Sequence, residues 1–181
     1  MNKNSTIDIE MEVKPGSTSS RRAAALADRI EQGAAELAAF AATLSEDEWR
    51  APMPGGGNDK RPVGIIVHHV ASAYPIEIEL ARTIARRHAA PDITSEDVDE
   101  LNARHARNVA NAGKTTTLDL LYRNSRDAAA AVRAFSDEEL DRAAPFSLSD
   151  GALVTVQFVI EDHAVRHSWH HLARIRRTLG R

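Results

Sequence analysis

Two histidines near the C-terminal end of the chain are spaced so that they could bind one metal ion together. His167 and His171 lie four residues apart in the segment 161–178, and on a helix of 3.6 residues per turn both fall on the apolar side with Ile160 and Ile175. Their Cβ atoms would be roughly 5 to 6 Å apart, so one ring nitrogen from each could reach the same divalent ion at about 2.1 Å. Such a site needs a third ligand from another element.

His69 is the candidate for the third ligand. It borders the apolar face of a predicted helix that begins near Pro62, whereas its neighbour His68 is expected to point to the opposite side. Three neutral imidazoles leave an ion its full charge and at least one open position, which is typical of catalytic rather than structural sites. Imidazole ligands suit zinc, nickel, iron and copper alike, so the sequence predicts a divalent metal ion without naming it.

The spacing leaves an alternative pair of ligands. His163 lies four residues before His167, so these two could also share an ion, although the helical periodicity favours His167 with His171. A single histidine on an apolar face is usually a core residue bonded to a backbone carbonyl, and three inward-facing histidines count against that interpretation. Of the remaining histidines, His68 and His170 are expected to be exposed or to lie just outside the site, and His88 and His105 are expected on the surface.

Glu77 shares the apolar face of the helix that carries His69 and could act as a general base. The two residues are eight positions apart, about 12 Å along a helix, so a salt bridge is a better prediction for Glu77 than metal ligation. Between them, Pro75 removes the amide that would bond the carbonyl of Ala71, which predicts a kink in this helix.

The composition limits the classes of function. A chain of 181 residues fits one domain with a buried core, and the absence of cysteine excludes disulfides, thiolate metal sites and a cysteine nucleophile. A net charge of -3 and 4% aromatic residues are unlike a nucleic-acid-binding surface. No window approaches the roughly 18 apolar residues of a membrane span, and the first 20 residues lack the apolar core of a signal peptide. We therefore expect a cytoplasmic protein without nucleic-acid or membrane partners.

The hydrophobic periodicity predicts an all-α protein, a four-helix bundle without a convincing sheet. The four amphipathic segments are residues 21–44, 62–88, 116–135 and 160–179. A more polar fifth segment, residues 94–112, is expected to be an additional surface helix or a lid. Residues 1–20 are expected to be a flexible N-terminal segment, and residues 21–181 to form the bundle domain.

Short motifs mark where these helices begin and end. Ser45 with Glu48 and Ser136 with Glu139 predict capping boxes for two short helical turns. Thr94 or Ser95 is expected to cap the polar helix, and Thr116 or Thr117 the helix after it. The glycine-rich residues 52–62 and the segment 147–156 are expected to be loops, and the last helix should stop before Gly180.

The segments VGIIVHHVASA, residues 63–73, and HSWHHLARIR, residues 167–176, resemble the DinB-like superfamily of metal-dependent four-helix-bundle proteins. That family includes thiol-dependent S-transferases and maleylpyruvate isomerases. The resemblance covers most of the chain from Arg21 to Leu179 and implies that His69, His167 and His171 hold a divalent ion with open positions for water. It also implies a small-molecule substrate such as a thiol, transferase or hydrolase activity, and a homodimer. Arg174 stands where such proteins often have glutamine, which leaves the substrate class open.

Three hypotheses follow from the sequence. The first is a metal-dependent enzyme, which requires an ion with an exchangeable position and an adjacent pocket. The second is a non-catalytic bundle in which the ion only links two helices. The third is a metal-free binding module in which the histidine cluster responds to pH.

Overall fold

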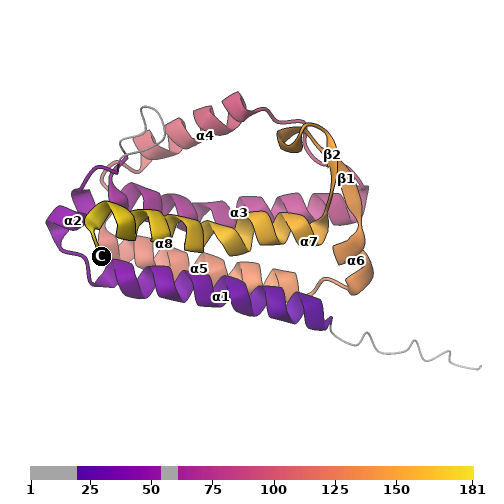
Figure 1. Ribbon diagram of the computed structural model, residues 1–181, viewed down its shortest axis with the longest axis horizontal. Helices are drawn as coiled ribbons and strands as arrows, with labels where there is room; N and C mark the ends of the chain where they lie inside the picture. Colours follow the sequence, from indigo (N-terminus) through magenta and orange to yellow (C-terminus); the bar gives the residue numbers. More distant parts are fainter. Residues whose placement is uncertain (1–19, 54–60) are drawn as a thin grey trace, which may run out of the picture.

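Four long helices form the body of the protein in a computed structural model that describes residues 20–53 and 61–181 (Figure 1). Three of them are α1 (Arg21–Ala42), α3 (Val63–Arg87) and α5 (Lys114–Arg133). The fourth is a continuous helical rod made of α7 (Val156–Val159), the π-helical segment η2 (Ile160–Val165) and α8 (Arg166–Leu179). The predicted four-helix bundle is therefore confirmed. The expectation of a flexible segment at residues 1–20 lies almost entirely outside the described residues.

The helices are not arranged around the bundle in the order of the sequence. Helix α1 packs against α5 and α8, while α3 packs against α5 and the rod that contains α8. Helices α1 and α3 therefore occupy opposite corners, and α5 lies diagonally across from the last rod (Figure 1). This topology makes α3 and α8 neighbours, so histidines almost 100 residues apart in sequence can meet.

The core consists of the apolar stripes of the four long helices, as their periodicity predicts. It includes Leu26, Ile30, Leu37, Ile66, Tyr74, Ile84, Leu121, Val132, Ile160, Leu172 and Ile175, all of which are buried. No helix in residues 20–53 and 61–181 has the length and apolar character that crossing a membrane requires.

Local capping signals explain where most elements begin. The capping boxes of Ser45 with Glu48 at α2 (Glu46–Arg50) and of Ser136 with Glu139 at α6 (Asp137–Asp141) are both present. Thr94 caps α4 (Ser95–Asn108), the predicted additional surface helix. Helix α8 ends at Leu179, before Gly180 with its φ of 68°. The prediction of a threonine cap for α5 is wrong, because this helix begins at Lys114 after Gly113, without a side-chain cap.

A two-stranded sheet replaces the loop predicted before the last helix. Strand β1 (Ala143–Phe146) pairs antiparallel with β2 (Ala152–Thr155), and the 3-10 turn η1 (Ser147–Ser149) joins them. Each strand has only four residues, too few for a clear period-2 pattern, which is why the sequence predicted a loop. This hairpin, residues 143–155, rises from the bundle toward the start of α4 (Figure 1).

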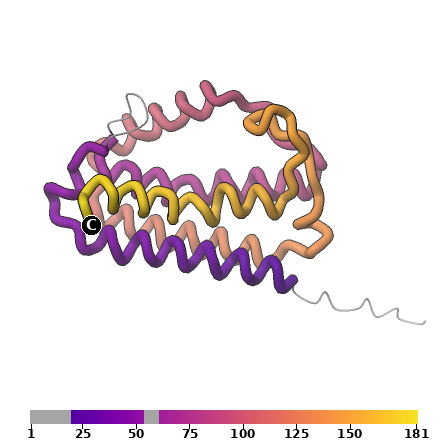
Figure 2. Tube along the Cα trace, viewed as in Figure 1, coloured from indigo at the N-terminus to yellow at the C-terminus, as the bar shows by residue number. Residues whose placement is uncertain are grey.

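Helix α4 lies apart from the bundle. Figure 2 shows it on the side of α3 that faces away from α1, bridged to the bundle at its two ends by connecting segments. None of its residues is buried. Residues of both α3 and α4 line a cavity between the two helices, next to His69.

Candidate metal centre

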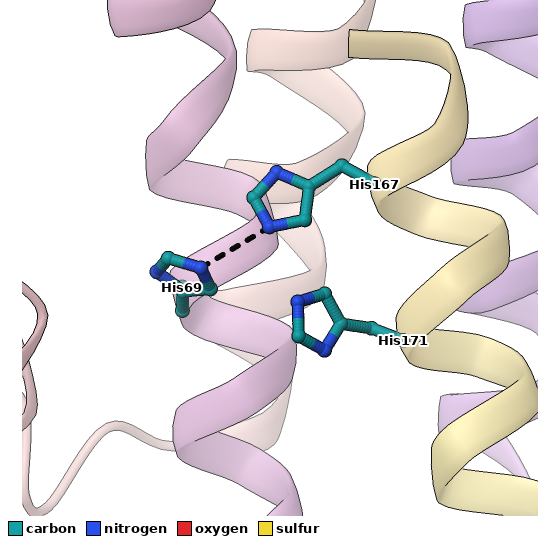
Figure 3. Close-up of side chains that lie close together, drawn as sticks. All are labelled: His69, His167 and His171. Carbon is teal, nitrogen blue, oxygen red and sulfur yellow. Dashed lines mark hydrogen bonds between the residues drawn. The ribbon is translucent and has the colours of Figure 1, made fainter. Parts of the chain in front are cut away.

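Helices α3 and α8 bring the three predicted ligands together. The rings of His69, His167 and His171 point toward one another across the interface between the two helices (Figure 3). Each offers one nitrogen, and these three atoms all lie within 4.8 Å of one another. The ring centroids of His167 lie 4.9 Å from those of both His69 and His171, and the centroids of His69 and His171 are 5.6 Å apart.

The nitrogen separations fit a shared cation. The Nε2 atoms of His69 and His167 are 3.1 Å apart. Two nitrogens bound to one tetrahedral ion at about 2.1 Å lie about 3.4 Å from each other, so only a small adjustment separates this pair from a ligand pair. The third ring nitrogen, from His171, faces the same space (Figure 3).

The electrostatic environment keeps the buried ring of His171 neutral. His171 is 6% exposed, and its burial, helped by the neighbouring rings of His167 and His69, lowers its pKa to about 2. A neutral imidazole presents a lone pair to a metal, whereas a protonated ring cannot bind one. The residues present therefore satisfy the chemical requirements for an ion with nitrogen ligands.

Glu77 orients one of these rings. Its Oε1 atom lies 2.6 Å from Nδ1 of His167, and the carboxylate is 9% exposed. A carboxylate only accepts hydrogen bonds, so His167 donates from Nδ1 and its Nε2 is left with the lone pair. Glu77 therefore contacts His167 through a hydrogen bond to a neutral ring and not through the predicted salt bridge, and it does not belong to the group of three histidines whose nitrogens lie close together.

A second cross-link holds the helix that carries His167 and His171. Ser168 lies next to His167, and its Oγ atom is 2.7 Å from the hydroxyl oxygen of Tyr74 on α3. Both side chains are buried. Because this bond joins α3 to α8 beside the histidines, it fixes the rotation of one helix relative to the other.

Asn124 on α5 supports α3 at its proline. Pro75 leaves the carbonyl of Ala71 without its helical donor, and the side-chain amide of Asn124 donates to that oxygen at 2.8 Å. Helix α3 continues through Pro75 from Val63 to Arg87. The carbonyl that the sequence suggested would be freed close to the site is thus satisfied by another helix.

The alternative ligand His163 lies outside the group. It belongs to the π-helical segment η2, in which the i→i+5 bonding pattern widens the turn, so it does not share the angular relation that His171 has to His167. Its ring contacts that of Phe146, with centroids 6.1 Å apart. The sequence predicted a regular α-helix here, and the π-helical segment was not anticipated.

Two further histidines, His68 and His105, lie next to the site, and for His105 this contradicts the sequence-based prediction. His105 on α4 was expected at the surface, but its Nε2 atom is 3.0 Å from Nδ1 of His68, which also lies 3.1 Å from Oγ of Ser72. The rings of His105 and His69 have centroids 5.8 Å apart. Burial lowers the pKa of His68 and of His105. Val98, Leu101 and His105 recur at helical spacing, and this pattern could have placed His105 on the inward face of α4.

The predictions for His88 and His170 are confirmed, since both are exposed.

Comparisons with known proteins agree with this architecture. A family model described as the DinB superfamily matches residues 29–175. No curated protein matches the chain. Among solved structures, the chain is similar to YfiT from Bacillus subtilis, with a TM-score of 0.68 and 20% sequence identity over 92% of this chain and 93% of that one. That protein is described as "a probable metal-dependent hydrolase with an unusual four-helix bundle topology". At this identity the similarity shows the shared fold alone.

Proposed function

Because the chain belongs to the DinB superfamily, we propose that it is a metal-dependent enzyme acting on a small molecule, with His69, His167 and His171 as the ligands of one divalent ion. The observation that carries this proposal is the convergence of three ring nitrogens within 4.8 Å of one another, one of them on a ring held by a buried carboxylate. Structural sites usually have four protein ligands, whereas three ligands leave a position for a reactant.

The donor set supports chemistry with an activated nucleophile. A bound divalent ion lowers the pKa of a coordinated water or thiol and thereby supplies a nucleophile at neutral pH. All three ligands are uncharged when they bind, so the ion would keep its full positive charge at this position. Glu77 holds the proton on Nδ1 of His167 and so keeps the Nε2 lone pair directed into the site.

The surroundings leave access for a substrate. His69 and His167 line one cavity of about 340 Å³ between α3 and α4, and His167 and His171 line a second one of about 250 Å³ with Asp162, Arg166 and His170. A closed coordination shell that only links two helices would not need open space on both sides. Attack by water on the substrate gives a hydrolase, in line with the description of YfiT, and attack by a thiol gives a transferase.

Elemental analysis of protein purified without a histidine tag tests the ligand set. We expect one equivalent of divalent metal per chain in the wild type and its loss in His69→Ala and His171→Ala. His163→Ala and His88→Ala serve as matched controls and should retain the metal. Loss of metal from His163→Ala together with its retention in His171→Ala would replace His171 by His163 in the ligand set.

Cobalt substitution then separates an enzyme from a metal-linked bundle. The visible spectrum of a three-histidine Co²⁺ site with an open position changes when azide or 2-mercaptoethanol is added, because the added ligand enters the coordination sphere. An unchanged spectrum would support the non-catalytic bundle. Hydrolysis of p-nitrophenyl acetate and conjugation of a thiol to 1-chloro-2,4-dinitrobenzene, compared between the wild type and His171→Ala, distinguish hydrolase from transferase.

A further inference from the structure

The cavity between α3 and α4 is lined mainly by apolar side chains. It has a volume of about 340 Å³ and opens beside His69 and His167. Its apolar lining includes Ala73, Ile76, Leu80, Val98, Leu101 and Phe146, and the polar side chains of Ser72, Asn102, His105 and His163 also line it. No lysine or arginine is among the described residues that line it. Among the described residues of the lining, Glu77 alone carries a carboxylate, and it bonds to His167.

The apolar side of α4 is left without close packing. An amphipathic helix on the surface normally buries its apolar stripe against the core, but no residue of α4 is buried. Leu101 is 38% exposed and Ile76, on the opposite wall, is 56% exposed, although both line the cavity. Two apolar surfaces that face each other across an open space offer a binding site for an apolar molecule.

Contacts near both ends of α4 hold this wall in place. Before its first turn, the backbone amide of Ile93 donates to Oγ of Ser147 at 3.1 Å, and that hydroxyl donates to the carbonyl of Ile93 at 2.7 Å. Toward its C-terminal end, His105 pairs with His68 on α3. The cavity is therefore bounded by an anchored helix and by the hairpin, and it persists without tight packing between α3 and α4.

The second cavity beside the histidines has the opposite character. It is lined by Asp162, Arg166 and His170 together with His167 and His171, and Arg166 pairs with Asp162 at 2.6 Å. Charged or strongly polar groups are better solvated there than under α4. The two cavities meet at His167, which lines both.

We propose that the cavity under α4 binds the uncharged aliphatic or aromatic body of the substrate, with the reacting polar group directed toward His69 and His167. The direction of the reacting group rests on the proposed metal-dependent activity, whereas binding of an apolar body rests on the cavity itself. The substrate class is thus a small, mainly apolar molecule with one reactive polar end.

Fluorescence titration of the full-length protein with N-phenyl-1-naphthylamine, an uncharged apolar probe, tests the cavity. The wild type should bind the probe with enhanced, blue-shifted emission, in the presence and in the absence of zinc. Leu101→Asp on α4 and Ala73→Phe on α3 should each weaken binding at least tenfold. Leu153→Asp changes an apolar residue that is 73% exposed and does not line the cavity, so it is the matched control and should bind as the wild type does.

Competition defines the chemistry of the occupant. Straight-chain alcohols should displace the probe more effectively as the chain lengthens, and carboxylates of equal length should displace it less. Absence of probe binding to the wild type, or equal binding by Leu101→Asp, Ala73→Phe and Leu153→Asp with unchanged circular dichroism, overturns the proposal. Zinc retention by His69→Ala and His171→Ala would instead overturn the metal centre and leave the cavity assignment standing.

Discussion

The Nδ1 atom of His167 on α8 lies 2.6 Å from the Oε1 atom of Glu77 on α3, and both side chains are largely buried. This bond keeps the proton of His167 on Nδ1. Its Nε2 atom, which faces His69, therefore carries the lone pair. Glu77 lies two turns from His69 on the same helix, so one segment supplies both a candidate ligand and the group that orients another. Contacts between α3 and α8 thus orient the side chains of the candidate site.

Replacement of Glu77 by glutamine should weaken metal binding. The amide keeps an acceptor for His167 but removes the negative charge that makes the ring a stronger ligand, so we expect the zinc affinity to fall by about tenfold or more. Competition with a chromophoric chelator measures this affinity. Glu79→Gln changes an exposed carboxylate on the same helix and should leave the affinity unaltered. Equal affinities in the two variants would contradict the orienting role of Glu77.

The metal-free protein should lose stability in acid because of His171. The folded protein holds the pKa of this residue at about 2, whereas the unfolded chain binds the proton at its ordinary pKa of about 6.5. Below about pH 6.5 the free energy of unfolding should therefore fall by up to about 1.4 kcal/mol per pH unit from this residue alone.

Urea unfolding at several pH values below neutrality measures this slope. His171→Leu removes the titrating ring. The slope of the free energy of unfolding against pH should therefore become shallower by up to about 1.4 kcal/mol per pH unit, the contribution of one proton. His88→Asn is the control for loss of a histidine ring, since His88 is exposed and asparagine tolerates its left-handed φ of 51°. A slope in His171→Leu as steep as in the wild type would show that another group dominates the acid response.

Asn124 should stabilise the protein only because Pro75 interrupts α3. Asn124→Ala leaves the Ala71 carbonyl without a donor and should cost about 1 to 3 kcal/mol. In a Pro75→Ala background, the new backbone amide at residue 75 can bond to that carbonyl, so the same change should cost less. A double-mutant cycle by urea unfolding gives the coupling energy, and a value near zero would refute this compensation.

Gly64 should be intolerant of a side chain because Trp49 lies against it. A Cβ atom at Gly64 would overlap ring atoms of Trp49, which is buried. We expect Gly64→Ala to destabilise the fold by about 1 to 3 kcal/mol. At Gly33 the nearest atom belongs to the partly exposed Trp169, at 2.9 Å, so Gly33→Ala should cost less. Denaturant midpoints compare the two, and the reverse order would contradict this explanation.

Much of the local structure could be predicted from the sequence. The long helices, the capping boxes of Ser45 and Ser136 and the end of α8 at Gly180 depend on hydrophobic periodicity and capping chemistry within a few residues. The periodicity also favoured His167 with His171 over His163, because a spacing of four puts two side chains on one face of a helix.

Contacts between elements could not be predicted in this way. The hairpin of β1 and β2 depends on pairing between two short strands, and the approach of His105 to His68 depends on where α4 lies beside α3. The π-helical segment before His167 has no signal in a pattern that assumes regular helices.

The sequence by itself determined which residues form helices and which faces of those helices are apolar, since these properties depend on neighbours along the chain. Only the tertiary structure decided that α3 lies beside α8, that Glu77 meets His167, and that α4 leaves an apolar cavity next to His69. These relationships depend on how side chains from distant segments fill space together, and no local pattern encodes that packing.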